Sequence, residues 1–375
     1  MVKEGYKETE IGIIPENWNL LSAKNLMKIE TGSRNTEHKS DNGKYLFFVR
    51  SQQVEHIDDY HYDCEAVLTA GDGVGTGKVF HYVNGKFDAH QRVYVMSQFK
   101  DIHGKFFYNY FKENFGNEVA KYTAKSSVDS VRRDMIAEML IPVPNIEEQQ
   151  KIAEALSDMD ILISSLEKLI EKKKAIKQGA MQELLTGKKR LSGFSGEWIA
   201  KKIKDIADVG RGRVISQVEI TRNIGGRYPV YSSQTSNDGI MGYLQTFDFE
   251  GEYITWTTDG VNAGTVFYRS GKFNCTNVCG TLKCKKDNTA FVARRLGVET
   301  PNYVATNLAN PKLMNDVMKN IIVTLPPTFE EQTAIATILS NMDNEITALE
   351  QKLAKCQKLK QGMMQQLLAG KIRLV

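Results

Sequence analysis

PNIEEQ at residues 144–149 recurs as PTFEEQ at residues 327–332, an offset of 183 positions (327 minus 144). The match continues without a gap to GKKRL at 187–191 and GKIRL at 370–374, with roughly half of the aligned positions identical. A repeat that occurs only twice indicates pseudo-twofold symmetry, because a solenoid needs three or more units. A monomer with two equivalent halves is suited to recognising something that is itself bipartite.

Each copy of the repeat is predicted to form one long helix. Thr328 followed by Glu331 is a capping-box pattern, and Asn145 marks the same helix start in the first copy. Gly187 and Gly370 follow the last apolar pairs and are predicted to end the two helices. The roughly 41 residues between these signals would form a rod of about 60 Å at 1.5 Å per residue.

Apolar residues in both helices follow an alternating spacing of four and three, which is typical of the a and d positions of a coiled coil. These seam positions are Ile152, Leu156, Met159, Ile163, Leu166 and Ile170 in the first helix, and Ile335, Leu339, Met342, Ile346, Leu349 and Leu353 in the second. Continuing the register places Lys177 and Lys360 on the seam, where a polar group costs stability but can fix alignment. Gly179 and Gly362 predict close backbone approach to the other helix or to a partner's helix, with a tolerated surface glycine as the alternative.

The two seams are predicted to pack against each other within one chain, in the antiparallel orientation that a pseudo-twofold axis requires. An intermolecular coiled-coil dimer is the competing arrangement. The linker 188–198 would lead into the second globular region, and the C-terminal residues 371–374 would dock beside residues 10–18 at the equivalent place.

The two globular regions that precede the helices are weakly related to each other. Residues 48–52 align with 230–234, and the Asp-Gly-Val of 72–74 aligns with that of 259–261. Short β-rich runs between glycine turns predict a curled, mainly antiparallel sheet in each region. The predicted fold class is α+β: two pseudo-symmetric α/β domains joined by two long antiparallel helices that form an intramolecular coiled coil. The predicted boundaries are 1–143 for the first domain, 144–191 for the central helix, 192–326 for the second domain and 327–375 for the distal helix.

The composition is that of an ordinary soluble globular protein, with 41% hydrophobic and 25% charged residues among 375. Neither a signal peptide nor an apolar run of membrane-spanning length is visible, so we expect a cytoplasmic protein without membrane association. The five cysteines fit a reducing compartment, and the spacing of Cys275, Cys279 and Cys284 favours buried free thiols over a metal site. A net charge of +4 is compatible with nucleic-acid binding.

No catalytic site is predicted. The glycine-rich stretch 71–78 lacks the glycine and hydroxyl positions of a Walker phosphate loop, which favours a tight turn between strands. Neither a methyltransferase Asn/Asp-Pro-Pro-aromatic loop nor a zinc-protease or serine-hydrolase motif is present. The acidic pairs at 147–148 and 330–331 lie in first helical turns, where the helix dipole is sufficient to explain them.

Together these residues resemble the DNA-specificity (S) subunit of type I restriction–modification systems. The markers are the paired Pro…Glu-Glu-Gln helix starts, the KQGxMQ…LLxGK helix ends and GIMGY at 239–243, and the resemblance covers essentially the whole chain. It implies a non-catalytic subunit in which two target-recognition domains each read one half of a split site in double-stranded DNA. As partners it implies two modification subunits (adenine methyltransferases) docked on the helical spacer, and restriction or translocase subunits. S-adenosylmethionine, ATP and Mg would be bound by those partners, and no cofactor by this chain.

Polar residues in the predicted loops of the two domains are the candidate DNA contacts. Arg, Gln and Asn can pair bidentately with base edges in the major groove, whereas Ser, Lys and Thr more often bind phosphates. An ordinary solvated surface role is the alternative for any one of them. The candidates are Arg34, Arg50, Ser51, Gln52, Lys78, Gln91, Arg92, Lys125, Arg132 and Arg133 in the first domain, and Arg211, Arg213, Ser232, Ser233, Gln234, Thr235, Asn237, Asn262 and Asn277 in the second.

Two other functions stay open at this point. A coiled-coil scaffold without DNA specificity would bind its partners regardless of DNA sequence. An enzyme with its own nucleotide or methyl-donor site would turn over ATP, or bind S-adenosylmethionine, on its own. A specificity subunit instead predicts sequence selectivity above a salt-dependent background.

Overall fold

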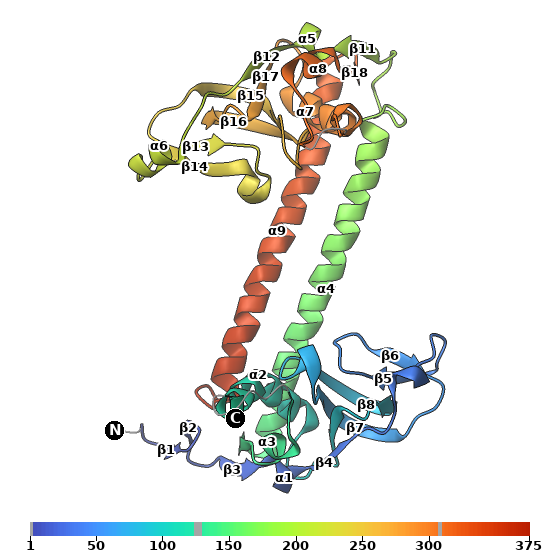
Figure 1. The fold of residues 1–375 in the computed structure, drawn as a ribbon, viewed down its shortest axis with the longest axis vertical. Helices are drawn as coiled ribbons and strands as arrows, with labels where there is room; N and C mark the ends of the chain where they lie inside the picture. Colours follow the sequence, from blue (N-terminus) through green and yellow to red (C-terminus); the bar gives the residue numbers. More distant parts are fainter. Residues whose placement is uncertain (1–2, 124–129, 307–309) are drawn as a thin grey trace. The chain divides into compact units, whose positions relative to one another are not determined.

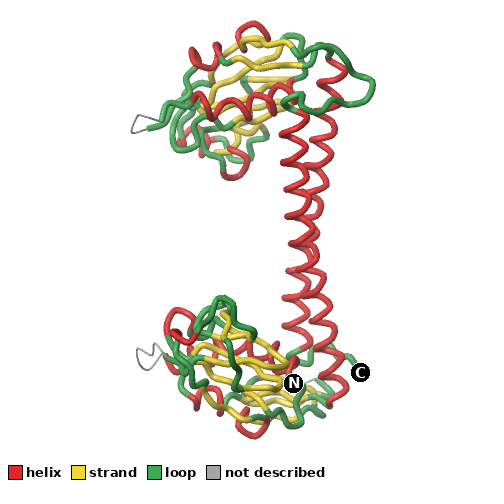
Figure 2. The backbone as a smooth tube through the Cα atoms, turned by 90° about the vertical axis from the view of Figure 1, so that its right-hand side faces the viewer, coloured by secondary structure: helices red, strands yellow, loops and turns green. Residues whose placement is uncertain are grey.

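The computed structural model of the chain describes residues 3–123, 130–306 and 310–375 (Figures 1 and 2). Two compact units make up the chain: Met1–Glu167 with Gln351–Val375, and Lys168–Glu350. Each unit contains one α/β domain and part of both long helices. The predicted α+β fold class is confirmed.

The first domain is built on a six-stranded sheet with the strand order β4-β9-β7-β8-β5-β6. Neighbouring strands run antiparallel except β5 and β8, which are parallel. The strands of this sheet are β4 (Lys28–Thr31), β5 (Tyr45–Phe48), β6 (Glu55–Ile57), β7 (Tyr62–Ala70), β8 (Phe80–Ala89) and β9 (Val93–Ser97). Two further antiparallel pairs are β1 (Tyr6–Thr9) with β2 (Gly12–Pro15) and β3 (Asn19–Ser22) with β10 (Leu140–Val143). The helices are α1 (Ala23–Leu26), α2 (Gly104–Thr123) and α3 (Arg133–Ala137), with the 3-10 turns η1 (Thr36–His38) and η2 (Gly73–Gly75).

Apolar side chains cover both faces of this sheet. Successive side chains of β7 point to opposite faces, so its neighbouring residues belong to two different clusters. Ala66 and Leu68 pack with Phe87 in one cluster. Val67 packs with Phe107 of α2 in another. The predicted, mainly antiparallel sheet is confirmed, and the glycine-rich stretch after β7 forms the predicted turn, η2.

The six-stranded sheet of the second domain repeats that of the first, strand for strand. Its sheet has the order β12-β17-β15-β16-β13-β14, with β13 and β16 as the parallel pair. The strands are β12 (Ala207–Arg211), β13 (Tyr228–Tyr231), β14 (Ile240–Leu244), β15 (Phe249–Thr257), β16 (Val266–Cys275) and β17 (Cys279–Cys284), with the separate pair β11 (Ile199–Lys202) and β18 (Ile322–Leu325). The helices are α5 (Ile203–Ile206), α6 (Gln217–Arg222), α7 (Thr289–Glu299) and α8 (Asn315–Asn320), with the 3-10 turns η3 (Ser236–Gly239) and η4 (Thr300–Tyr303).

The two long helices are α4 (Ile146–Leu184) and α9 (Phe329–Leu367), each of 39 residues. Every predicted seam position is buried or half-buried. The seam lysines bind acids of the other helix: Lys360 pairs with Asp160 at 2.5 Å in the first unit, and Lys177 pairs with Asp343 in the second. The start of α4 packs with the end of α9 in the first unit, and in the second unit Lys174, which precedes Lys177, binds Glu350, which follows Asp343. In each unit the helices therefore run antiparallel within one chain, as predicted. Neither they nor the other helices in the described ranges combine the length and apolarity needed to cross a membrane.

A buried acid–arginine pair closes each unit at the start of a long helix. In the first unit, Nε and Nη2 of Arg373 donate to the two carboxylate oxygens of Glu148 at 2.5 and 2.7 Å. In the second unit, Arg190 binds Glu331 in the same way at 2.6 and 2.7 Å. Both carboxylates are 1% exposed. Explaining these acids by the helix dipole alone is therefore wrong, because each is a desolvated partner of a bidentate arginine.

The capping boxes predicted at both helix starts are only half formed. The N–H of Glu148 donates to Asn145 Oδ1 at 2.9 Å, and the N–H of Glu331 donates to Thr328 Oγ1 at 3.3 Å. The reciprocal bond is replaced because the two carboxylates turn to the arginines instead of to the cap backbone.

The glutamine of each repeat start is also structural. Gln149 is fully buried, accepts from the His103 N–H at 2.7 Å and donates to the Pro144 carbonyl at 2.9 Å. Gln332 makes similar bonds with the Asn288 N–H, at 2.7 Å, and with the carbonyl of Pro326, one residue before the counterpart of Pro144, at 3.2 Å. Each glutamine thus ties the start of a long helix to the segment that precedes α2 or α7.

Gly370 is a helix terminator, as predicted, with a φ of +65°, and Gly187 is its counterpart at +71°. A Cβ on Gly370 would lie 2.5 Å from Pro15, so the end of α9 docks on the N-terminal segment, as predicted. Gly179 and Gly362 differ from the prediction of close approach within the chain, because a Cβ on either would meet nothing within 4 Å.

Replacing Arg373 with alanine is expected to lower the free energy of unfolding by about 2–4 kcal/mol, because the buried Glu148 carboxylate loses its cation. Arg190→Ala makes the equivalent change in the second unit and should cost a similar amount. The control is Lys24→Ala, which removes an exposed ion pair with Glu138 and should cost less than about 1 kcal/mol. Urea unfolding of the full chain measures all three, and equally small losses would contradict this account of the buried pairs.

Replacing Gly179 or Gly362 with alanine is expected to raise the free energy of unfolding by about 0.5–1 kcal/mol, since alanine restricts the unfolded chain and fits the open helix surface. The matched control is Gly370→Ala, which should destabilise because its φ is positive and Pro15 occupies the Cβ position. Thermal unfolding gives the sign of each change. A destabilised Gly179→Ala protein would show that another segment does approach that helix surface.

Candidate nucleic-acid interface

The candidate residues of the first domain lie on loops that the backbone ties together. Hydrogen bonds of 2.9 and 2.8 Å join the turn at residues 90–92 to Phe48, at the end of β5, and to Gly71, after β7. A third bond, of 2.8 Å, joins the same turn to Arg34, after β4. The short β8–β9 turn therefore brings Arg34, the segment after β5 and the loop after β7 to one place.

Asp72 holds two of the candidate arginines. Nη1 of Arg50 donates to one of its carboxylate oxygens at 2.9 Å, and Nη1 of Arg92 donates to the other. Burial alone would raise the pKa of Asp72, but the hydrogen bonds from Arg50 and Arg92 outweigh it, and the pKa lies below its ordinary value. Burial, together with the charge of Arg50, lowers the pKa of the neighbouring His90. Near neutral pH this group is therefore one carboxylate, two guanidinium cations and a neutral imidazole.

Arg34 and Gln91 are engaged by their neighbours. Nε of Arg34 donates at 2.9 Å to Asp88, whose side chain is fully buried, and this bond raises the pKa of Arg34. Nε2 of Gln91 donates to Asn35 Oδ1 at 2.6 Å. Arg34 thus neutralises an acid of the fold while lying next to the arginine pair.

Three further candidates of the first domain are exposed: Ser51, Gln52 and Lys78. Ser51 Oγ donates to the Gln53 carbonyl at 2.8 Å, which shapes the segment after β5. Lys78 follows η2, on the loop that also carries Asp72.

The basic candidates near α3 form a second group. Arg132 and Arg133 are exposed, and Nε of Arg133 donates to the Ile29 carbonyl at 3.3 Å. Lys125 lies outside the described residues. The structure connects this group to the arginine pair through the loop after β7, because the Val131 N–H donates to the Gly71 carbonyl at 2.7 Å.

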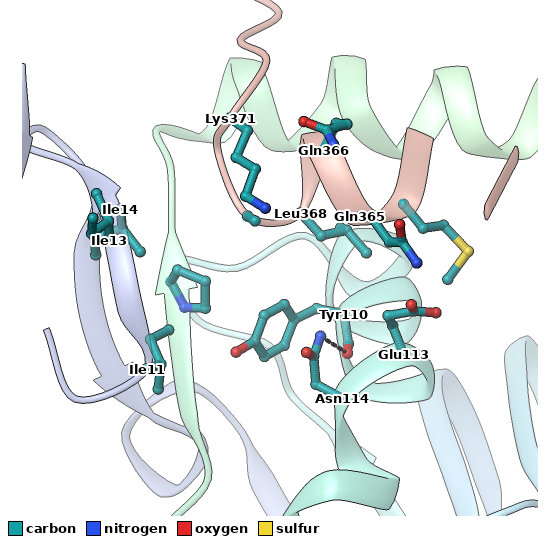
Figure 3. A pocket seen from close by; sticks show the side chains of 13 residues that line it. Ile11, Ile13, Ile14, Tyr110, Glu113, Asn114, Gln365, Gln366, Leu368 and Lys371 are labelled. Carbon is teal, nitrogen blue, oxygen red and sulfur yellow. Dashed lines mark hydrogen bonds between the residues drawn. The ribbon is translucent and has the colours of Figure 1, made fainter. Parts of the chain in front are cut away.

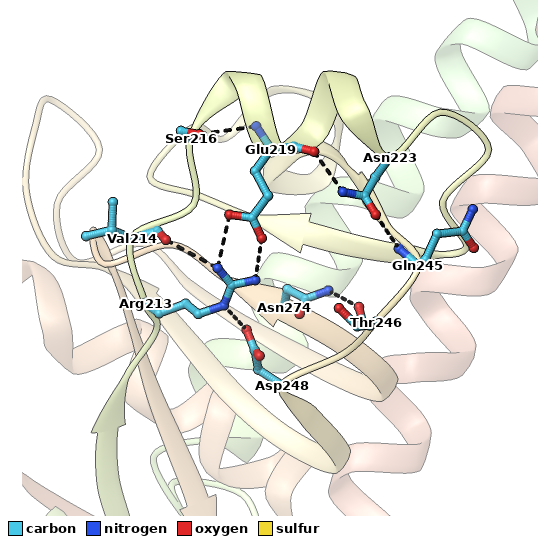
Figure 4. Close-up of polar contacts among 9 residues, drawn as sticks. All are labelled: Arg213, Val214, Ser216, Glu219, Asn223, Gln245, Thr246, Asp248 and Asn274. Atoms are coloured by element: carbon cyan, nitrogen blue, oxygen red, sulfur yellow. Dashed lines mark hydrogen bonds and ion pairs between the residues drawn. The ribbon is translucent and has the colours of Figure 1, made fainter.

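Arg213 is the centre of a polar network in the second domain (Figure 4). Its Nε donates to Asp248 at 3.0 Å, and its two Nη groups donate to the carboxylate oxygens of Glu219 at 3.1 and 2.6 Å. The hydrogen bonds between Arg213 and Glu219 raise the pKa of the arginine and lower that of the acid. Helix α6, whose N-cap Ser216 accepts from the Glu219 N–H, is thereby fixed to the segment after β12.

The segment 232–239, after β13, carries five candidates on a turn of uncommon conformation. Asn237 and Asp238 have φ of 49° and 53°, a region that few residues with a side chain adopt. The buried Arg269 holds this turn, since it donates to the Asp238 carboxylate at 2.5 Å and to the Asp238 carbonyl at 2.8 Å. Its guanidinium also lies 3.7 Å from the centre of the Tyr231 ring. Arg269 thus fixes how the whole segment is presented.

Within that segment Thr235 and Asn237 are exposed, whereas Ser232, Ser233 and Gln234 are half-buried. The Gln234 side-chain amide donates to the Ile240 carbonyl, so this candidate is partly committed to the turn.

The other candidates of the second domain lie on its equivalent loops. Arg211 is exposed, and its Nη2 donates to Thr258 Oγ1 at 3.2 Å. Asn262 is half-buried, and its carbonyl accepts from Thr265 Oγ1 at 2.8 Å. Asn277 is exposed on the β16–β17 turn.

Backbone hydrogen bonds show which loop residues of the two domains correspond. The His90 N–H donates to the Phe48 carbonyl, and the Thr276 N–H donates to that of Tyr231. Phe48 therefore corresponds to Tyr231, and the alignment of 48–52 with 230–234 is wrong by one residue. The β13–β14 pairing is irregular at this strand end.

The corrected correspondence shows that the shared backbone carries different side chains. Counting two residues on from Phe48 and Tyr231 sets Arg50 against Ser233, and residues 232–234 include no arginine. Arg92 corresponds to Val278, because their carbonyls accept from the N–H groups of Gly71 and Thr258 in the two domains. Asp72 and Asp259 follow those glycine and threonine positions, so the carboxylate is shared and the two arginines are not.

Sequence reasoning missed two residues that organise these loops. Asp72 was visible as part of the Asp-Gly-Val match, and that identity was the available signal. Arg269 lies within β16 as one charged residue among β formers, and nothing around it in the sequence indicates burial.

A pocket of about 300 Å³ in the first unit lies apart from the candidate DNA contacts (Figure 3). It lies between the β1–β2 hairpin, α2 and the end of α9, and its labelled lining includes Ile11, Tyr110, Asn114 and Gln365. The Asn114 side chain donates to the Tyr110 carbonyl at 2.9 Å. The DNA candidates are not among its lining residues, so the pocket is no part of the candidate interface.

Solved structures and relatives resemble this chain. The S subunit of the type I restriction–modification system of M. genitalium matches with a TM-score of 0.70 at 17% identity, over 94% of this chain and 96% of that one. Two Mycoplasma pneumoniae proteins, provisionally named type I specificity subunits, are 45% and 39% identical over 159 and 210 residues. These alignments cover 42% and 55% of this chain, and 43% and 81% of the two relatives. For the first relative, the match thus spans less than half of its length.

The family comparison covers most of the chain. The model of the type I restriction modification DNA specificity domain matches twice, at residues 15–178 and 195–359. Each match includes one α/β domain and most of the long helix that follows it. The chain therefore belongs to the type I restriction–modification DNA specificity family.

Proposed function

We propose that this chain is the DNA-specificity subunit of a type I restriction–modification complex, in which each domain reads one half of a bipartite double-stranded target. The observation that carries the proposal is one backbone framework, repeated, with different polar side chains at corresponding loop positions. A duplicated fold needs no difference between its two sets of loops in order to be stable. Two domains that read unlike half-sites must present different side chains on those loops.

The chemistry of the loops supports DNA as the ligand. Arginine, glutamine and asparagine, which pair with base edges in the major groove, stand on loops of both domains beside serine, threonine and lysine, which suit phosphates. The overall charge of +4 favours approach to a polyanion. Membership of the DNA-specificity family points the same way.

The partners and cofactors follow from that role. Two modification subunits (adenine methyltransferases) would dock on the long helices, and restriction or translocase subunits would complete the complex. S-adenosylmethionine would be held by the modification subunits, and ATP with Mg by the restriction subunits. This chain would supply sequence recognition and would hold the duplex while a partner flips and methylates a base.

Selection from random double-stranded DNA by the full chain with its modification subunits is expected to yield two separate conserved blocks. Competing unrelated DNA should bind more weakly, and that background should fall steeply as salt rises, because phosphate contacts release counterions. A coiled-coil scaffold without DNA specificity predicts no enrichment at all. Absence of any enriched sequence would overturn the proposed function.

Replacing residues 195–326 with a second copy of residues 15–143 is expected to make the chain select the same block twice. The physical reason is that each domain folds around its own sheet and presents its own loops. The same DNA selection measures the change. If the repeated-domain protein still selected two different blocks, the proposed division of reading between the domains would be wrong.

A further inference from the structure

Arg50, Asp72 and Arg92 form a group that we call the arginine fork. We infer that the arginine fork reads guanine, so that the half-site of the first domain contains at least one guanine at a position the fork contacts. In this reading Arg50 and Arg92 contact the base edges, and Asp72 is a positioning residue. The inference rests on the proposed function and adds the chemistry of one half-site to it.

The two guanidinium groups of the fork are exposed, and its carboxylate is largely buried. The side chains of Arg50 and Arg92 are 46% and 61% exposed, whereas that of Asp72 is 16% exposed. Arg50 and Asp72 help to line a hollow of about 420 Å³, together with Thr36, Val49, Ser51, Gly73 and Gly75. Because both arginines are more exposed than Asp72, a ligand that approaches the arginine fork meets guanidinium groups before it meets the carboxylate.

The hydrogen-bonding capacity of the fork suits a guanine edge. A guanidinium carries five N–H donors in a fixed plane. Each arginine binds Asp72 through Nη1, so each keeps donors that this bond does not use. Guanine offers two acceptors, O6 and N7, in the major groove, and bidentate arginine binding to them is the commonest specific contact with DNA bases.

Asp72 reduces the cost of presenting these side chains. A free arginine loses much rotamer freedom when it binds, whereas an arginine already held by a carboxylate has lost part of it. Gly75 contributes to the same arrangement, because a Cβ there would lie 2.5 Å from the Arg50 carbonyl. The close approach of these two loops brings Arg50 within reach of Asp72.

Folding alone gives a poor account of the fork. One carboxylate shared by two guanidinium groups leaves a net positive charge and keeps two like charges near each other. Exposed ion pairs contribute little to stability in any case. An arrangement of this kind is useful where an anionic, acceptor-rich ligand completes it.

The second domain supplies a natural comparison. Asp259 stands at the position of Asp72, while Ser233 and Val278 stand at the positions of Arg50 and Arg92. The backbone and the acid are therefore common to both domains, and the arginines belong to the first domain. A serine and a valine cannot pair bidentately with guanine, so we do not expect the second domain to read guanine at this place.

The test is DNA selection with the full chain and its modification subunits, followed by binding measurements on the selected sequence. The repeated-domain protein described above identifies which block the first domain reads. In that block the wild type is expected to select guanine. Arg50→Lys and Arg92→Lys keep the charge but lose the planar fork, and at least one should lower the preference for guanine about tenfold or more.

Asp72→Asn tests whether Asp72 positions the two arginines for guanine, as distinct from contributing to DNA binding in general. It should lower the guanine preference of the first block, while affinity for unrelated DNA stays equal or rises, because a negative charge has been removed. A merely structural role would lower both together. Asp259→Asn is the matched control and should leave the guanine preference of the first block unchanged. If Asp72→Asn fails to fold, the two lysine variants decide the question by themselves.

The possible failures are distinguishable. A first block without guanine, or lysine variants that keep the wild-type preference, would overturn the reading by the fork and leave the bipartite recognition intact. A wild type that enriches no sequence would overturn the proposed function itself.

Discussion

The fold depends on one interaction made twice: a carboxylate buried at the start of a long helix and bound by an arginine that follows the end of the other. A desolvated carboxylate is strongly unfavourable without its cation, so losing Arg373 would leave Glu148 with an uncompensated buried charge. Trp18 adds a bond of 3.2 Å from its indole nitrogen to the same carboxylate. In the first unit this one site therefore joins the N-terminal segment, a long helix and the C-terminus.

Much of this architecture was predictable because its signals are local or periodic. The seam spacing, the caps and the terminating Gly370 are each visible within a few residues. The role of Glu148 was not predictable in this way, since its partner lies 225 positions away and a first-turn acid already has a local explanation. The alignment near Tyr231 was misplaced for a different reason. It matched Ser-Gln at 51–52 with Ser-Gln at 233–234 by identity, whereas the backbone hydrogen bonds place Phe48 at the position of Tyr231.

The candidate interface also has a part that was predictable from the sequence and a part that was not. The turn residues, glycine above all, predicted where the loops lie in the sequence. Corresponding loops appear in both domains. The pairing state of each arginine could not be predicted, because it depends on acids brought together by the fold. Arg34 binds Asp88, 54 positions away, and Arg213 binds Asp248, 35 positions away. The sequence alone therefore does not distinguish an arginine that pairs with an acid of the fold from one that is presented to a ligand. Asp72 differs from these acids because it binds two arginines at once, and both remain more exposed than the carboxylate that holds them.

The placement of the two buried pairs also bears on how such a chain could have arisen. A polypeptide of half this length, with one domain and one helix, would carry both the acid and the arginine. A helix of 39 residues, about 58 Å long, would keep the two apart. Neither charge could satisfy the other within such a polypeptide, but two copies would satisfy each other reciprocally. The present chain thus has the bonding pattern of two half-length copies joined into one, in which each copy supplies the arginine for the acid of the other.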